Sequence, residues 1–383
     1  MFIAMYDMLL QSGRVIDPAN KLDAVMDIAI ADGAIAAIAT SIDSTEADQT
    51  RDPSGCLITP GLIDLHTHVY WAGTSIGVEP TRYAHQAGTT TLIDAGTAGA
   101  ANFLGFRRHV IEKAQPRILA FLNISFPGIY AFSESVMVGE CANLDLLEPG
   151  ECLKVAREHS DLIVGIKVRV GRGASGEQGI APLDIAIEVA DELGLPVMCH
   201  LDHPPPSRLD VVSRLRQGDI LTHCFRPFPN APARLRDATV REEIIAARER
   251  GVIFDIGHGK GSFGYATAEV MLECGFAPDC ISSDVHVLSI VGPAHDQLVT
   301  MSKFLALGMS LDQVIAASTC EPAKAVRRPE LGHLAIGTPA DISVLKLEEG
   351  EFEFLDVEGE MRIGKTQIRP HSLMIGGNWL AAP

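Results

Sequence analysis

Leu62-Ile63-Asp64-Leu65-His66-Thr67-His68 is the stretch on which both the fold and the chemistry of the chain depend. It follows the turn residues Thr59-Pro60-Gly61, so a turn leads into a short apolar run that ends in two histidines. Side chains two residues apart on a strand point to the same face, so His66 and His68 can present two imidazoles to one point. Imidazole is the commonest metal ligand in proteins. On its own the pattern also fits two surface histidines at a strand end, and the rest of the chain decides between these interpretations.

Seven further apolar runs follow, and helical stretches such as 183–193 and 241–250 lie between them. The eight runs are 62–66, 89–94, 117–123, 162–168, 196–200, 220–223, 251–256 and 280–284. Nearly continuous apolar strands that alternate with helices are typical of a closed (β/α)8 barrel. The alternative, an open doubly wound sheet, would require a glycine-rich phosphate turn after an early strand, and we find none. The sequence therefore predicts an α/β fold built on a TIM barrel.

The two ends of the chain have a different pattern. Residues 1–57 contain short strand signals joined by turns, with Asp32-Gly33 as a type I′ hairpin signal. Strand signals return late in the chain and continue to Trp379. We therefore predict a small β-sandwich domain formed by residues 1–57 and 335–383, beside a barrel domain of residues 58–334.

Composition narrows the possible function. The chain has 383 residues, of which 47% are hydrophobic, enough for a barrel with an accessory domain. No uninterrupted run of eighteen apolar residues and no basic leader are present, so we expect neither a membrane partner nor a signal peptide. Eight scattered cysteines favour reduced thiols and a cytoplasmic location. A net charge of −18 argues against nucleic acid as a partner.

The sequence leaves the oligomeric state open: the protein could be a monomer or a homo-oligomer.

Six polar residues fall at or near the carboxyl ends of the predicted strands. They are His66, His68, Lys167, His200, His223 and Asp284. In a barrel these ends form one face, where the loops build the active site. Each residue has a plain structural explanation by itself: a histidine can be an ordinary hydrogen-bonded side chain, the lysine can form an ion pair, and the aspartate can cap a helix. Six coincidences at one barrel mouth are improbable, so we predict a metal site there.

Lys167 is the unusual member of this set, because an ammonium repels a metal ion. Burial lowers the pKa of a lysine, and a neutral amine can add CO2 to form a carbamate. The two carbamate oxygens could bridge two metals. Four histidines, one carbamate and one aspartate suit two divalent ions, with Zn²⁺ as the default and Mn²⁺, Fe²⁺ or Co²⁺ as alternatives.

These motifs resemble those of the amidohydrolase superfamily over almost the whole chain. Residues 60–68 resemble its first-strand signature, residues 88–91 its second-strand motif, and residues 337–342 its return to the β-sandwich. The order His-x-His, Lys, His, His, Asp is similar to that of the binuclear subtype shared by dihydroorotases, hydantoinases and related deacetylases.

The resemblance implies a role for each predicted ligand. His66 and His68 would hold the more buried metal together with Asp284. His200 and His223 would hold the more exposed metal. Lys167, as a carbamate, would bridge the two.

The chain departs from the dihydroorotase pattern at one informative position. That group typically follows His-x-His with x-Arg, and the arginine holds a substrate carboxylate. Here His68 is followed by Val69-Tyr70-Trp71. The segments 94–100 and 258–263 are closer to the amidohydrolase/deacetylase branch.

Further polar residues near the predicted mouth are candidates for substrate contact. They are Arg169, Arg172, His203, Tyr130, His258, Lys260 and His286. The two arginines could hold a carboxylate, although a solvated salt bridge is about as plausible for each. Tyr130 could donate to a developing oxyanion, with packing as its alternative role. The other four could equally be part of the loop structure.

We therefore predict a metal-dependent hydrolase of an amide or related acyl bond, such as that of an N-acyl amino acid or an acyl ester, in a small substrate that carries a carboxylate. Two metals would lower the pKa of a bridging water and polarise the carbonyl, and Asp284 would carry the proton to the leaving group. The alternative is hydrolysis of a cyclic amide, as in dihydroorotases and hydantoinases. A deaminase ranks lower, because His200-Leu201-Asp202-His203 lacks the glutamate of the mononuclear deaminase motif. A non-catalytic homologue would be expected to have lost several ligands.

Overall fold

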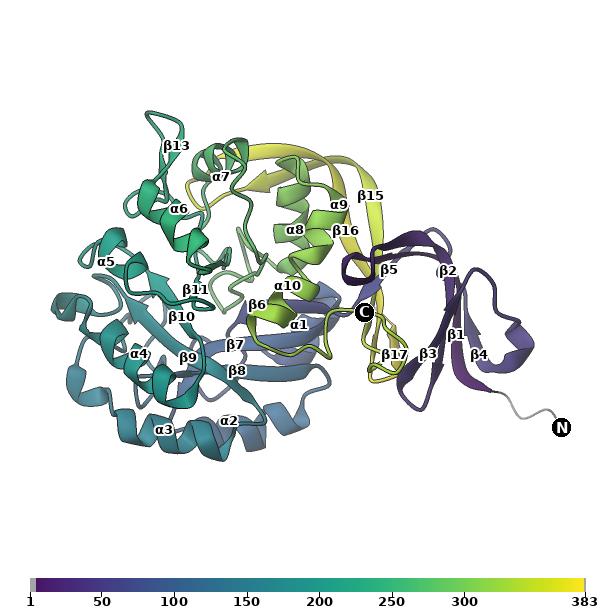
Figure 1. The fold of residues 1–383 in the computed structure, drawn as a ribbon, viewed down its shortest axis with the longest axis horizontal. Coiled ribbons are helices and arrows are strands. Elements are labelled where there is room, and N and C mark those ends of the chain that lie inside the picture. Colours follow the sequence, from purple (N-terminus) through teal and green to yellow (C-terminus); the bar gives the residue numbers. More distant parts are fainter. Residues whose placement is uncertain (1–4, 382–383) are drawn as a thin grey trace.

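The computed structural model describes residues 5–381, which form a parallel barrel sheet with its helices and a separate mixed sheet (Figure 1). The outermost residues of the predicted terminal domain, 1–4 and 382–383, lie outside the described residues. No helix within residues 5–381 combines the length and the hydropathy of a membrane-spanning segment.

The barrel sheet has seven regular parallel strands in chain order. They are β6 (Leu62–Thr67), β7 (Thr89–Gly99), β8 (Arg117–Asn123), β9 (Ile163–Val170), β10 (Val197–Leu201), β11 (Ile220–Leu221) and β14 (Ile253–Phe254). Each of these strands starts within three residues of its predicted apolar run. Helices cover the strands, and their apolar faces share one large hydrophobic core with them. The predicted α/β barrel fold is therefore confirmed.

The eighth predicted strand closes the barrel, but it does so without regular pairing. Single parallel bridges join Asp255 to Cys280 and Thr67 to Val285, so this segment lies between the last strand and the first. Two local features interrupt the strand. Asp284 has a φ of +49°, and the backbone N–H of Ser283 donates to the side chain of Asp64 at 2.9 Å rather than to a neighbouring strand.

The helices have the following bounds: α1 (Pro80–Ala87), α2 (Phe103–His109), α3 (Pro149–Glu158), α4 (Ala181–Leu193), α5 (Arg208–Val212), α6 (Glu242–Glu249), α7 (Tyr265–Glu273), α8 (Gln297–Ala306), α9 (Leu311–Ala316) and α10 (Cys320–Ala325). Short 3₁₀ helices span Pro18–Asn20, Ser44–Glu46, Ile111–Lys113, Leu144–Leu146 and Gly176–Gln178, and β12 (Ala233–Arg234) pairs with β13 (Thr239–Val240). Both predicted helices, 183–193 and 241–250, match α4 and α6. The chain leaves α4 at Gly194, which adopts the left-handed conformation that favours glycine.

The second sheet joins the two ends of the chain. Its strands are β1 (Tyr6–Asp17), β2 (Leu22–Ala31), β3 (Ala34–Ala39), β4 (Ala47–Arg51), β5 (Leu57–Pro60), β15 (Ile342–Leu355), β16 (Met361–Ile375) and β17 (Asn378–Ala381). Their order is β17-β16-β15-β5-β1-β2-β3, with β4 also paired to β1. Asp32 and Gly33 both have positive φ and link β2 to β3, which confirms the predicted hairpin turn. The predicted residue boundaries between the two domains stay a prediction.

The hairpin formed by β15 and β16 is longer than the strand it joins: β15 pairs with β5 only through residues 342–345, and the rest of the hairpin runs on past β5. Figure 1 shows the two strands in yellow, arching over α8 towards α7. The backbone N–H of Ile368 donates to Ser302 of α8 at 2.9 Å, and Arg362 pairs with Glu269 of α7 at 2.6 Å. The terminal strands therefore reach the side of the barrel that carries the site described next.

Candidate metal site at the carboxyl ends of the barrel strands

The structure places all six predicted ligands around one cavity of about 370 Å³. His66, His223 and Asp284 are buried and offer ligand atoms that lie within 4.8 Å of one another. The rings of His200 and His223 are 4.5 Å apart between centroids, and those of His66 and His68 are 5.4 Å apart. Residues from five separate segments of the barrel therefore converge on a volume that suits a metal ion.

Hydrogen bonds fix the tautomer of His66. Its Nδ1 lies 2.8 Å from the hydroxyl of Thr222, and this hydroxyl donates to Asp255 at 2.7 Å. Because the hydroxyl proton is used in the second bond, Nδ1 must be the donor in the first. The Nε2 lone pair of His66 then faces the cavity, as ligation requires.

In His68 and His223, as in His66, a group of the protein contacts Nδ1. Nδ1 of His68 lies 2.8 Å from the hydroxyl of Thr97, whose backbone N–H donates to Asp94 at 2.7 Å. Nδ1 of His223 donates to the carbonyl of Gly257 at 2.6 Å. Both rings therefore keep Nε2 available for a ligand bond. These threonines and aspartates were missed from the sequence, although Thr222 adjoins His223 and Asp94 ends a predicted strand.

His200 supplies the test of whether a metal fits. Its Nε2 is buried and has no hydrogen-bond partner within residues 5–381, with the nearest carboxylate oxygen, of Asp202, 3.7 Å away. A buried imidazole nitrogen without a partner is costly, and a metal ion would satisfy it. Burial and the charge of Arg169 lower the pKa of His200 well below its ordinary value, so the ring is neutral and can ligate. Burial also lowers the pKa of His68, to about 3.

Lys167 is fully buried among these histidines. Its Nζ lies 3.4 Å from Nε2 of His66, and in the described part of the chain it forms no ion pair with a carboxylate. Burial lowers its pKa to about 8, although Asp284 favours the charged form. A Cβ on Gly96 would lie 2.4 Å from the Lys167 side chain, so β7 packs directly against it. The lowered pKa makes the neutral amine, which is the form that can react with CO2, more accessible than in an exposed lysine.

Asp284 lies beside two of the imidazoles. Its Oδ1 is 3.2 Å from Nε2 of His68 and 3.4 Å from Nε2 of His66. Burial raises the pKa of Asp284 to about 6. Gly259 packs against the other oxygen, because a Cβ there would lie 2.3 Å from Oδ2. The carboxylate can therefore contact a metal and also exchange a proton near neutral pH.

Only some of the predicted substrate contacts line this cavity. The residues that do are Arg169, His203, Lys260 and His286. Arg172 is exposed, and Tyr130 is 42% exposed and also lies outside the lining. The side chain of His258 is buried and faces Lys303 instead. Loop conformation, which the sequence pattern does not encode, accounts for these differences.

Arg169 is held between two residues that the sequence did not single out. Its Nε lies 3.5 Å from Glu140, which is 1% exposed and whose carboxylate oxygens accept no hydrogen bond from the rest of residues 5–381. Its guanidinium lies 5.7 Å from the centroid of the Phe132 ring, which in turn meets the ring of His286 edge-on at 5.1 Å. Glu140 and Phe132 therefore contact Arg169 at the cavity. Arg226 lines the cavity as well and was also missed.

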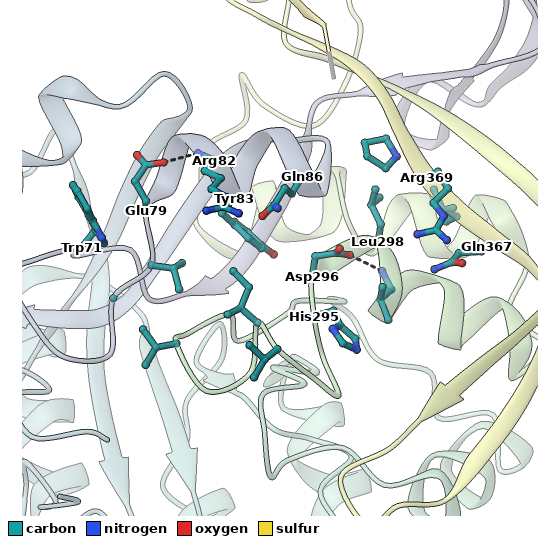
Figure 2. Close-up of a pocket in the computed structure, with 18 residues that line it drawn as sticks. Trp71, Glu79, Arg82, Tyr83, Gln86, His295, Asp296, Leu298, Gln367 and Arg369 are labelled. Atoms are coloured by element: carbon teal, nitrogen blue, oxygen red, sulfur yellow. Dashed lines mark hydrogen bonds between the residues drawn. The ribbon is translucent and has the colours of Figure 1, made fainter. Parts of the chain in front are cut away.

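A larger cavity of about 770 Å³ lies elsewhere, between α1, the loop before α8 and β16 (Figure 2). Asp296 accepts a hydrogen bond from the backbone of Val299 there at 2.8 Å, and Arg82 and Arg369 lie along its edge. None of the six predicted ligands lines it. The titratable groups that could support catalysis are concentrated at the smaller cavity.

Comparisons with known proteins agree with this arrangement. A family model described as a deacetylase-like composite domain matches residues 334–379. A deacetylase of Brucella anthropi is 35% identical over 365 residues, which cover 94% of this chain and 89% of that protein. The fold matches a crystal structure of an adenine deaminase with a TM-score of 0.91 and 31% identity, over 98% of this chain and 100% of that chain. It also matches a crystal structure of a dihydroorotase with a TM-score of 0.90 and 33% identity, over 98% and 99% of the two chains.

Proposed function

Because the chain belongs to the deacetylase family of the amidohydrolase superfamily, we propose that it hydrolyses an acyl bond, amide or ester, in a small substrate that carries a carboxylate. The observation that carries the proposal is the convergence of neutral imidazoles, a buried lysine and a carboxylate on one cavity. The Brucella anthropi relative, which is named a deacetylase, supports an acetyl group as the acyl part.

Two divalent metal ions, Zn²⁺ by default, are the cofactors in this proposal. His66, His68 and Asp284 would hold one ion, and His200 and His223 the other. Lys167 would join them as a carbamate, which its burial and lowered pKa support. When bound, such a pair of ions acidifies a water molecule and polarises the carbonyl of the substrate.

Asp284 would move the proton. Its carboxylate lies at the cavity and, with a pKa raised by burial, can accept a proton from the attacking water and return it to the leaving group. His286 would assist at the substrate. Its Nδ1 accepts the backbone N–H of Leu288 at 3.2 Å, so Nε2 carries the proton and can donate a hydrogen bond.

Arg169 would bind the carboxylate of the substrate. The planar guanidinium suits bidentate binding of a carboxylate, and its contacts with Glu140 and Phe132 support a restricted orientation. The positive charges of Lys260 and Arg226 on the same cavity also favour an anionic ligand. A neutral ligand such as adenine would gain little from this set of charges.

The alternative functions are ring opening of a cyclic amide and deamination. The crystal structures of a dihydroorotase and an adenine deaminase resemble this chain, so both reactions belong in the test. Two features speak against them. Val69 and Tyr70 stand where a dihydroorotase has x-Arg. A mononuclear deaminase carries a glutamate on a helix just after this strand. Here β10, which contains His200, is followed by a loop that lacks this glutamate.

The test is a metal analysis followed by a substrate screen of the metal-loaded protein. We expect about two transition-metal ions per chain and turnover of N-acetyl amino acids or O-acetyl hydroxy acids. The carboxamide of each substrate serves as the control, and Arg169→Met should raise KM for the acid but not for the carboxamide. A kcat/KM of roughly 10⁴ M⁻¹s⁻¹ or more for dihydroorotate or adenine, without turnover of the acyl acids, would overturn the proposal.

A further inference from the structure

Lys303 is a buried lysine outside the cavity that joins three segments of the chain. It lies on α8, is 1% exposed, and donates to the carbonyls of Pro293 at 2.9 Å and Leu355 at 2.7 Å. Its third contact is Nε2 of His258 at 2.7 Å. Three acceptors match the three N–H groups of one ammonium. In the part of the chain that the structure describes, the three acceptors of Lys303 are neutral groups, and no carboxylate pairs with it.

His258 is the partner that leads towards the cavity. Its Nδ1 donates to the carbonyl of Gly259 at 2.9 Å, which leaves Nε2 as the acceptor for Lys303. The ring stacks on Phe263 with 4.8 Å between centroids and 27° between planes. These contacts fix the first residues of the loop after β14, which we define as residues 257–264.

The same loop forms the wall beside Asp284. The N–H of Gly259 donates to the carbonyl of Ser283 at 2.9 Å, and a Cβ on Gly259 would lie 2.3 Å from Oδ2 of Asp284. The backbone of the loop therefore restricts the orientation of the Asp284 carboxylate. A shift of this backbone would change where the carboxylate points.

The β15–β16 hairpin also contacts Lys303 and the end of the loop. Leu355, the last residue of β15, supplies the carbonyl that binds Lys303. Asp356 accepts the backbone N–H of Tyr265 at 2.8 Å, and the N–H of Val357 donates to the carbonyl of Phe263 at 3.2 Å. The turn of the hairpin that arches over α8 in Figure 1 thus contacts the end of the loop that faces Asp284.

We propose that Lys303 is a positioning residue of the active site, through which the end of the β15–β16 hairpin fixes the loop after β14 against Asp284. The terminal sheet then contributes directly to the geometry of the barrel mouth. The kinetic part of this inference rests on the proposed function. The loop geometry can be measured without any substrate, so the two can fail separately.

The test compares three single variants. Lys303→Met keeps most of the length of the side chain and removes all three donors. His258→Phe keeps a ring for the stacking on Phe263 and removes the acceptor. The control is Lys365→Met, because Lys365 lies on the same hairpin, is exposed, and pairs with the exposed Glu351 at 2.6 Å. If Lys303→Met does not fold, His258→Phe tests the same link from the other end.

We expect kcat of the metal-loaded enzyme to fall about 10- to 100-fold in Lys303→Met and His258→Phe, with KM within about threefold of wild type, because a misplaced catalytic group affects the chemical step. The double variant should lose little more than either single variant, since both cut one link. Lys303→Arg, which retains donors and charge, should restore part of kcat. Lys365→Met should match wild type.

Hydrogen–deuterium exchange of the same proteins supplies the readout that needs no substrate. Exchange should rise in residues 257–264 and 353–359 of Lys303→Met and stay unchanged in the strands β6 to β10. Faster exchange throughout the molecule, or a lower melting temperature with unchanged kcat and unchanged exchange in residues 257–264, would mean that Lys303 only stabilises the fold and would overturn the proposal. Local exchange that rises in the absence of any detectable turnover would support the loop geometry and count against the proposed function alone.

Discussion

Gly259→Ala is the substitution that examines the geometry of Asp284 most directly. The new methyl group would start 2.3 Å from Oδ2 of Asp284, whereas ordinary contacts of a Cβ begin at 3.4 Å. The carboxylate must therefore move by about 1.1 Å, and because it is the end of a short side chain it can do so without unfolding the loop. We expect the fold to tolerate the change and the chemistry to suffer from it.

The expected size follows from this displacement. A misplacement of about 1 Å at a catalytic group can cost roughly 10²-fold in rate, which corresponds to about 2.7 kcal/mol in the activation free energy. Gly259 also has a φ of +54°, so alanine adds backbone strain of about 1–2 kcal/mol to the folded state. The first effect appears in kcat and the second in the free energy of unfolding.

Gly194→Ala is the matched control for the strain. Gly194 has a φ of +65°, and within residues 5–381 no heavy atom lies within 4 Å of the position that the new methyl group would take. The substitution therefore strains the backbone without touching the cavity. Metal content, kcat and the urea midpoint should be measured on both variants. Both should lose similar stability, and only Gly259→Ala should lose about two orders of magnitude in kcat.

The reasoning would be refuted by a Gly259→Ala enzyme that keeps kcat within about twofold of wild type. It would also be refuted if Gly194→Ala lost as much activity as Gly259→Ala, because strain in general would then be the cause. Loss of metal from Gly259→Ala alone would still place Gly259 against a ligand, since Asp284 is the group it displaces.

Three further predictions concern the ligands themselves. Asp284→Asn should retain most of the metal and lose about 10²–10⁴-fold in kcat, because the amide can touch a metal but cannot accept a proton; kcat and metal content on one sample decide this. Burial raises the pKa of Asp284 to about 6 and bound cations favour its carboxylate form, so wild-type kcat/KM should decline as the pH falls through a value at or below 6, and an acid limb above pH 7 would contradict this. Lys167→Ala should lose metal and activity, and bicarbonate with a short-chain acid should restore part of both; a fully active Lys167→Ala enzyme would remove the carbamate from the mechanism.

Much of the barrel could be predicted because its signals are local. The apolar run before His66 and the alternation of strands and helices depend on neighbouring residues. Polar residues at strand ends meet at one face in any parallel barrel, so the grouping of His200 and His223 followed from topology alone. The eighth strand could be placed, but its irregular form could not be foreseen, because the positive φ of Asp284 depends on contacts with distant segments.

The surroundings of the ligands could not be predicted for the same reason. Glu140 and Lys303 come from a loop and a helix with no fixed spacing from the residues they contact, Arg169 and His258. Arg172 is close to the site in sequence, yet its side chain is exposed and lies outside the cavity lining, so its contact with a substrate stays a prediction. Contacts made across loops depend on the folded path of the chain, which periodicity does not report.

The place of β5 in the terminal sheet has a consequence for biosynthesis. β5 pairs with β1 on one side and with β15 on the other, so a strand near residue 60 completes its pairing only with residues 342–345. A ribosome releases almost the entire barrel before that partner exists, and until then β5 presents an unpaired backbone edge. Such an edge can pair with another nascent chain. A chain that terminates early, before residue 342, would keep this edge permanently, and it would be prone to aggregation even if every residue of the cavity were present.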